Sequence, residues 1–341
     1  MQSHTVPRKL LDQFAYYNPV TTSKRLWQYE KDHRPHGEAS PRSATRFEGH
    51  FSDPRNADRE RELENRLQRE IEEPVNAFIE AVKYTTFVLS AHHIRKLTRY
   101  ITLLFHRSRA RQRATQHQLD TMLASMNALL SNDEQLEAIA AKTTLENIER
   151  GYEPRVFTRE ELAEELRRTI QSHKADDQLQ HNYTETIESM LSAEDQNLLR
   201  GDWSILRTEP NDPFVIGDAP VVTWERIEKN TLMFGQGFGR PNVEALLPLS
   251  PTACLHVQPA VERTRPVMTP ATVEVNIAEA SFATQYCFTN IFSPKLDETL
   301  QAHFGQTRLG VNAFTLRHRD FTNTMYDILM NPGRGSAPPV K

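Results

Sequence analysis

The sequence predicts an α+β fold, with a mainly helical N-terminal half and a smaller β-rich C-terminal half. Residues 56–200 repeat apolar side chains three or four positions apart, which is the spacing of amphipathic helices. Residues 201–330 instead contain short apolar runs bounded by proline, glycine and asparagine, which is typical of strands. The chain has 341 residues, enough for one large domain or two.

The first 55 residues are predicted to form a docked N-terminal arm followed by a loop. Chain termini usually fray, but apolar side chains run from Val6 to Phe14, and their burial would carry His4 inward. Leu26–Tyr29 alternates like a strand. Residues 32–43 are rich in proline, histidine, glycine and serine, and this composition predicts a loop.

Residues 56–200 are predicted to form a series of helices. The first begins near Asp58, and Pro74 is expected to break or kink it because proline lacks an N–H and clashes with the preceding turn. The second begins after Ser90, a good N-cap residue. Thr158 and Glu161 have the spacing of a capping box. Further helices are expected near residues 115–130, 133–150, 159–174 and 184–200.

Residues 201–330 are predicted to form a β-rich α+β region. Strands are expected at Trp203–Arg207, Phe214–Ile216, Val221–Trp224, Ala245–Pro248 and Cys254–Val257. Helices are expected near 271–284, after Thr269-Pro270, and near 294–303, at Ser293-Pro294. Residues 331–341 have the composition of a disordered tail.

Composition narrows the classes of protein to consider. The formal net charge of −4 creates no overall field that favours nucleic acid. Cys254 and Cys287 lie in apolar surroundings, which predicts two buried free thiols. No apolar run approaches the ~18 residues of a membrane span, and the N-terminus lacks the apolar core of a signal peptide. We therefore expect a cytoplasmic protein in a reducing environment.

Two acids on the first predicted helix are candidate functional residues. Glu64 and Glu70 lie about 60° to either side of Leu67, so both point toward the side that packs inward. A buried carboxylate needs a cation, a metal or a proton. Two interpretations remain open: boundary acids paired with arginines, or acids that bind a metal or transfer protons.

Arg107 and Asp218 are the other candidates. Arg107 ends the second predicted helix, where it either complements the helix dipole or holds a carboxylate or a substrate phosphate. Asp218 follows Gly217 at the end of a strand. There it either forms an Asx-type turn or acts as a ligand or a base.

Several standard catalytic signatures are absent from the sequence. It contains no Gly-x-Ser-x-Gly elbow, no Walker lysine loop, no His-Glu-x-x-His and no paired Cys-x-x-Cys. Phe234–Arg240 has three alternate glycines, but it lacks the Gly-x-Gly-x-x-Gly spacing. No nucleotide cofactor is therefore expected.

Blocks along the chain resemble the uncharacterised bacterial family named domain of unknown function 4238. They are His4–Phe14, Leu26–Tyr29, Glu64 with Leu67 and Glu70, Arg107, Trp203, Phe214–Val221, Leu247–Pro251 and Asn276. The resemblance spans roughly residues 4–290, with Gly217 and Ala219 replacing the serine and asparagine usual beside the aspartate. It brings no established activity, but it implies that polar residues from distant segments share a site.

One functional hypothesis is a metal-dependent hydrolase of phosphodiesters. His4, Glu64, Glu70 and Asp218 would converge between the two halves and bind a divalent metal such as Mn²⁺, Mg²⁺ or Zn²⁺. The metal would activate water, and Arg107 would hold a phosphate of a nucleic acid or nucleotide. All five residues would then be catalytic. Such a nuclease-like enzyme would fit a toxin or a phage-defence effector.

The alternative hypothesis is a non-catalytic protein-binding module. The charged helical stretch 133–174 would contact the partner protein. The same polar residues would then form a structural ion network that fixes the helical half to the β-rich half. The two hypotheses differ in whether these residues surround an opening or close on one another in pairs.

Overall fold

The computed structural model describes most of the chain up to residue 305. The described residues are 2–48, 57–84, 87–149, 156, 158–173, 184–189, 191, 194–228, 231–235, 237–240, 242–258, 260 and 269–305. They form two compact units, the first drawn from 1–114 and 180–310 and the second from 115–179. The predicted tail at 331–341 lies outside the described residues.

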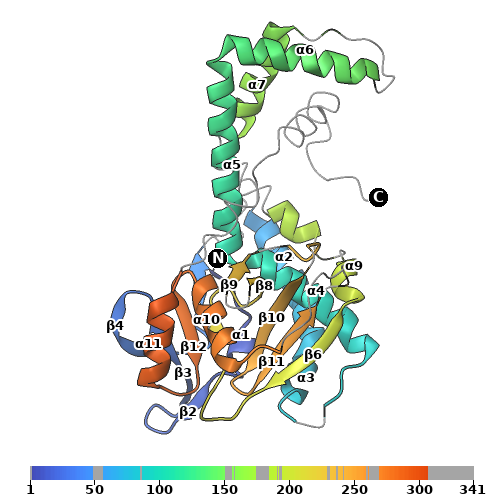
Figure 1. The fold of residues 1–341 in the computed structure, drawn as a ribbon. Helices are drawn as coiled ribbons and strands as arrows, with labels where there is room; N and C mark the ends of the chain where they lie inside the picture. Colours follow the sequence, from blue (N-terminus) through green and yellow to red (C-terminus); the bar gives the residue numbers. More distant parts are fainter. Residues whose placement is uncertain are drawn as a thin grey trace. The chain divides into compact units, whose positions relative to one another are not determined.

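The larger sheet of the first unit is antiparallel and has five strands in the order β6-β11-β10-β8-β9 (Figure 1). Its strands are β6 (Asp202–Arg207), β8 (Val222–Glu228), β9 (Thr231–Phe234), β10 (Val243–Ser250) and β11 (Ala253–Gln258). One face of this sheet packs in the main core through residues such as Leu247 and Leu255. The other face packs through Leu246 and Cys254 against a helix, α10 (Thr272–Phe282).

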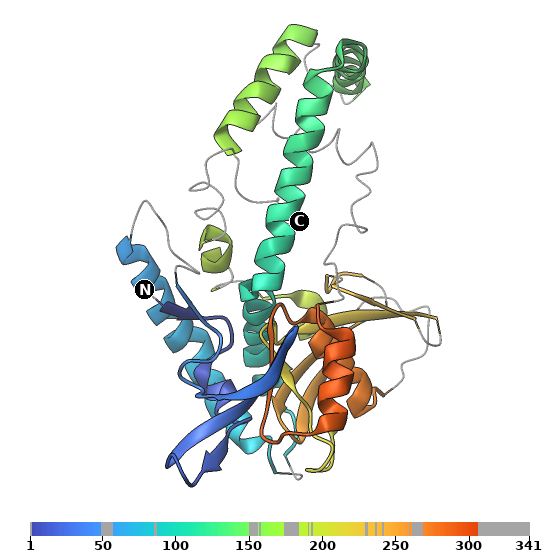
Figure 2. The ribbon, with the colours of Figure 1, turned by 90° about the vertical axis from the view of Figure 1, so that its left-hand side faces the viewer.

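A second sheet joins strands from both ends of the chain. Its strands are β2 (Tyr16–Asn18), β3 (Ser23–Glu30), β4 (His33–Ala39), β7 (Ile216–Gly217) and β12 (Tyr286–Thr289). β3 pairs with β12 and also with β2 and β4. Figure 2 shows the blue N-terminal strands next to the orange C-terminal elements. A separate ladder pairs β1 (Gln2–His4) with β5 (Arg46–Glu48).

The predicted division into a helical N-terminal half and a β-rich C-terminal half is therefore wrong, although the chain does combine helices with antiparallel sheets. Strands are scattered along the chain, and Tyr29 of β3 pairs with Cys287 of β12. The prediction of a loop over residues 32–43 is also wrong, because β4 occupies most of it. Pro35 fits there because β4 pairs only with β3 among the described strands, and proline is tolerated in an edge strand.

Helices make up the rest of the first unit. They are α1 (Arg8–Leu11), α2 (Ala57–Leu67), the π-helix η1 (Gln68–Glu72), α3 (Glu73–Ala81), α4 (Ala91–Arg107), the start of α5 (Arg109–Leu130), α9 (Gln196–Leu199), α10 and α11 (Pro294–His303). The first helix is interrupted before Pro74, as predicted: α2 ends at Leu67, the π-helix η1 follows, and Pro74 lies in the first turn of α3, where its missing N–H costs no hydrogen bond. Ser90 caps α4, as predicted. The predicted 184–200 helix is split into helical residues 184–189 and α9.

The N-terminal arm is docked. Val6, Leu10, Leu11 and Phe14 are all fully buried, and they belong to the same core as the helices α3 and α4 and one face of the larger sheet. The N–H of Thr5 also donates to the carbonyl of Thr45. Apolar burial therefore holds a segment that would otherwise fray.

The second unit contains the end of α5, together with α6 (Asp133–Glu149) and α7 (Arg159–His173). The unit has its own apolar core, which includes Met126, Leu136 and Leu166. Thr158 and Glu161 form the predicted capping box of α7, each side chain accepting from the other residue's backbone N–H. Among the described residues of both units, no helix is long and apolar enough to cross a membrane.

Candidate functional site

Arg107 lies at the centre of a buried ion cluster. Its side chain is 2% exposed at the end of α4, and it reaches α2 and η1. Its Nη1 donates to Glu72 Oε1 at 2.6 Å, and its Nη2 donates to Glu64 Oε2 at 3.1 Å and Oε1 at 3.2 Å. The guanidinium thus binds both carboxylates. Of the two interpretations given for Glu64, this arrangement agrees with an acid paired with an arginine.

Glu72 was not predicted as a site residue, whereas Glu70 was. Eight residues at about 100° each place Glu72 about 80° from Glu64 around an ideal helix, while Glu70 is about 120° away. The sequence therefore contains a signal that Glu72 is the better companion. The π-helical turn of η1 further changes the angle between Glu64 and Glu72 around the helix axis. A pattern of α-helical periodicity cannot predict this turn.

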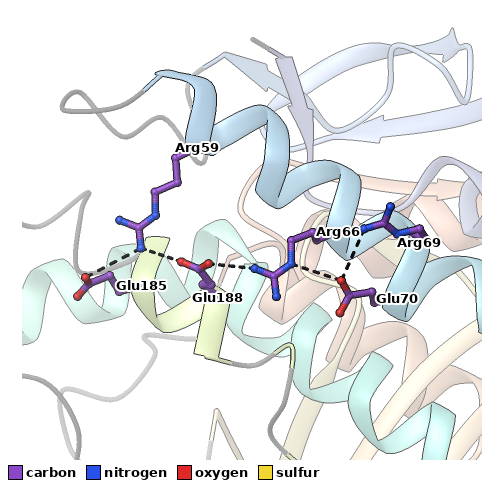
Figure 3. Close-up of polar contacts among 6 residues, drawn as sticks. All are labelled: Arg59, Arg66, Arg69, Glu70, Glu185 and Glu188. Atoms are coloured by element: carbon purple, nitrogen blue, oxygen red, sulfur yellow. Dashed lines mark hydrogen bonds and ion pairs between the residues drawn. The ribbon is translucent and has the colours of Figure 1, made fainter.

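Glu70 belongs to a different network, drawn in Figure 3. Its Oε1 lies 3.3 Å from Arg66 Nε and 3.9 Å from Arg69 Nη2. Arg66 also reaches Glu188 at 3.1 Å, and Arg59 donates to the same carboxylate at 2.7 Å (Figure 3). This chain of alternating charges ties α2 to the helical residues 184–189.

Burial shifts the pKa of several groups near Arg107. Burial raises the pKa of Glu72, and the charge of Arg107 opposes this change. Burial, assisted by the charge of Glu72, also raises the pKa of Tyr100 well above its usual value. Burial lowers the pKa of His106 to about 4, with the charge of Arg111 acting in the same direction. His106 is therefore a neutral imidazole at physiological pH.

Asp218 organises the connection between α10 and β12. Its carboxylate accepts from Thr284 N and Oγ1, both at 2.7 Å, from Gln285 N at 2.9 Å and from Tyr286 N at 3.3 Å. Burial raises its pKa, and these hydrogen bonds oppose the change. A carboxylate with four donors holds a backbone turn, and both of its oxygens are already engaged.

Two side chains of α10 hold the segment that precedes Asp218. Asn276 accepts from Val215 N and donates to Pro213 O, both at 2.9 Å. One turn later, Glu279 Oε2 accepts from Gly217 N at 2.7 Å. A Cβ at position 217 would lie 3.1 Å from the carbonyl oxygen of Glu279, so glycine permits this close approach.

Three of the four predicted metal ligands contact other groups in the described structure. Glu64 forms an ion pair with Arg107, and Glu70 contacts Arg66 and Arg69. The carboxylate of Asp218 accepts hydrogen bonds from the four donors described above. No group of three or more histidine, cysteine, aspartate or glutamate side chains within the described residues could hold a metal ion. His4 pairs through its backbone with Arg46, and its side chain lies outside the description. Convergence of the four ligands remains a prediction.

Glu279 is a buried acid that sequence analysis did not single out. Its side chain lies near Cys254 and Cys287, which are free and buried, as predicted. Its Oε1 has no hydrogen-bond partner among the described residues. Burial raises its pKa well above its usual value, the Gly217 amide opposes this change, and the charge of Asp218 adds to it. Glu279 is therefore expected to carry a proton in the folded protein over a wider pH range than in the unfolded chain.

Replacing Glu279 by glutamine should flatten the dependence of stability on pH. A raised pKa in the folded state stabilises the fold fully below the usual value of 4.5, and this stability is lost as the pH rises through the folded pKa. Urea unfolding of both proteins at a series of pH values from 5 to 8 measures the difference. The wild type should lose more free energy of unfolding across the window than Glu279→Gln. Parallel curves would contradict a proton on Glu279.

Comparison with known proteins identifies one match. A family model described as protein of unknown function (DUF4238) matches residues 2–291. No curated protein and no solved structure gives a significant match.

Proposed function

The chain belongs to the DUF4238 family, and from the ion pairs of the first unit and the exposed acids of the second we propose that it is a protein-binding module. In this proposal Glu64, Glu70, Arg107 and Asp218 hold the fold rigid. The second unit presents the contact surface through residues 133–174. The protein acts in the cytoplasm, an environment compatible with two free buried thiols.

The closed pairing of Arg107 carries this proposal. A guanidinium that serves a substrate must offer donors to it, but both Nη atoms of Arg107 already contact Glu64 and Glu72 inside the protein. Breaking such a buried pair is strongly unfavourable. The arrangement therefore supports a structural role for these residues over phosphate binding.

The surface of the second unit supports a partner with basic side chains. Glu134 and Glu137 on α6 are exposed, whereas the exposed Glu160 and Glu164 of α7 contact arginines of their own helix. Leu136 and Leu166 lie in the core of the unit, so the two helices can present charge without losing their packing. Exposed charges of this kind steer association and set partner choice.

A charge-reversal pair tests the partner surface. Full-length wild type and Glu134→Lys/Glu137→Lys are used as baits in cells that naturally produce the protein, with quantitative mass spectrometry. The partner that the wild type enriches is then purified, and its affinity for each bait is measured. We expect the affinity to fall about tenfold or more in the variant, because two attractive contacts become repulsive.

The matched control is Glu209→Lys/Glu298→Lys, which reverses two exposed acids of the first unit. It should bind the purified partner like the wild type. Equal loss in both variants, or no loss in either, would contradict a contact through residues 133–174.

The competing prediction is that the protein is a metal-dependent phosphodiesterase. A separate activity assay distinguishes this enzyme from the protein-binding module. Full-length protein is incubated with bis(p-nitrophenyl) phosphate or single-stranded DNA and Mn²⁺, Mg²⁺ or Zn²⁺, with and without a chelator. On our proposal, neither the wild type nor Glu64→Gln hydrolyses these substrates. Chelator-sensitive hydrolysis that disappears in Glu64→Gln would overturn the structural role of Glu64.

A further inference from the structure

Three neighbouring strands of the larger sheet place a serine, a histidine and a glutamate on one face. Ser204 of β6 is directly opposite His256 of β11, and His256 is opposite Leu246 of β10. Glu244 lies two residues before Leu246, so its side chain points to the same face as that of His256. The strand register therefore brings together residues that are 52 and 12 positions apart in the chain.

These side chains form a line of polar contacts. His256 Nε2 lies 2.7 Å from Glu244 Oε2, and Trp224 Nε1 donates to the same oxygen at 3.2 Å. On the other side of the ring, Nδ1 lies 3.5 Å from Ser204 Oγ. His256 and Glu244 are 3% and 7% exposed, whereas Ser204 is an exposed residue.

We propose that Ser204, His256 and Glu244 form a nucleophilic relay for acyl transfer from carboxylic esters. The arrangement has the three roles such a relay needs: an accessible hydroxyl, an imidazole within reach of it, and a buried carboxylate that orients the imidazole. This activity is separate from the partner binding proposed above and does not rest on it.

The tautomer follows from the neighbours of the ring. Glu244 as a carboxylate accepts the proton of Nε2, which leaves the lone pair of Nδ1 facing Ser204. The indole N–H of Trp224 donates to the same carboxylate oxygen and holds it in place against the ring. The ring is therefore poised to take a proton from the serine hydroxyl.

The reaction balances without a further reactant except water. Ser204 Oγ forms a bond to the ester carbonyl carbon while its proton passes to His256 Nδ1. The ester C–O bond then breaks, and the departing alkoxide takes that proton and leaves as the alcohol. Water, deprotonated by the same Nδ1, attacks the acyl-serine, and the proton returns to Ser204 Oγ as the carboxylic acid is released.

The position of Ser204 distinguishes this relay from a purely structural pair. A buried His–Glu contact alone would serve packing, and it would need no hydroxyl at its outer end. Ser204 lies on β6, which has β11 as its only neighbour among the described strands. Ser204 is also exposed, so a small ester in solution can reach its hydroxyl.

Labelling with a fluorophosphonate probe tests the inference on the full-length protein. The probe phosphonylates an activated serine with loss of fluoride, and peptide mass spectrometry locates the label. We expect wild type to be labelled at Ser204 and to hydrolyse p-nitrophenyl acetate, and Ser204→Ala to lose both properties. Ser125→Ala, which removes an exposed α5 hydroxyl that donates to a backbone carbonyl, should behave like wild type.

Glu244→Gln provides the second readout, because it keeps the shape of the side chain while removing its charge. The rate of Ser204 labelling should fall by about 10²–10⁴-fold, the usual contribution of an oriented general base. Circular dichroism spectra that match the wild type establish that each variant is folded. Absence of labelling in folded wild type, or equal labelling of Ser204→Ala, would overturn the inference.

Discussion

Arg107→Met is expected to reduce the free energy of unfolding by about 3–5 kcal/mol, the usual result of removing one partner from a buried ion cluster. The methionine would leave Glu64 and Glu72 facing each other without the guanidinium that now contacts both. Because burial already raises the pKa of Glu72, its carboxyl would take up a proton more readily in the variant. Urea unfolding followed by circular dichroism measures the loss.

Two comparisons make the Arg107 result specific. Arg159→Met removes an exposed arginine that pairs with Asp133 and Glu160, so its unfolding midpoint should match that of the wild type. Adding Glu64→Met and Glu72→Met to Arg107→Met should recover much of the lost stability, because apolar residues of similar volume replace a buried ion cluster well. Wild-type stability in Arg107→Met would show that the cluster does not hold the fold.

Phe14→Ala is expected to destabilise the protein by about 3–5 kcal/mol, because truncating a buried aromatic side chain removes apolar contacts and leaves a cavity. Phe14 is fully buried in the main core together with Leu10 and Leu11 of α1. The measurement is again the free energy of urea unfolding. A large effect so close to the N-terminus would establish that the arm is an integral part of the first unit.

Tyr17→Ala serves as the control for Phe14→Ala. Tyr17 lies three residues later, is 64% exposed and is also aromatic, so its truncation should change stability by no more than about 0.5 kcal/mol. Similar small effects for both variants would contradict docking of the arm. If only Tyr17→Ala has a small effect, the loss of stability in Phe14→Ala is explained by the burial of Phe14.

Local structure could be predicted because it depends on residues close together in the chain. Ser90 and the Thr158–Glu161 pair identified helix starts, since a cap satisfies backbone N–H groups within one turn. The helices predicted near 271–284 and 294–303 correspond to α10 and α11, and the strand-like alternation at Leu26–Tyr29 lies within the longer β3. Apolar content alone likewise predicted that Cys254 and Cys287 would be buried and free.

The partners of the site residues could not be predicted, because they depend on contacts between distant segments. The π-helical turn before Pro74 helps to place Glu72 in contact with Arg107, whereas Glu70 forms its ion pair with Arg66. Asp218 meets backbone N–H groups, which have no sequence signature.

The sequence determined where most helices and strands begin and which apolar side chains lie inside, because hydrophobic periodicity and capping act over a few residues. The tertiary structure alone decided that β3 pairs with β12 and that Ser204, His256 and Glu244 share one face. Strand pairing joins segments that any number of residues can separate, so register and the chemistry that depends on it become visible only after folding.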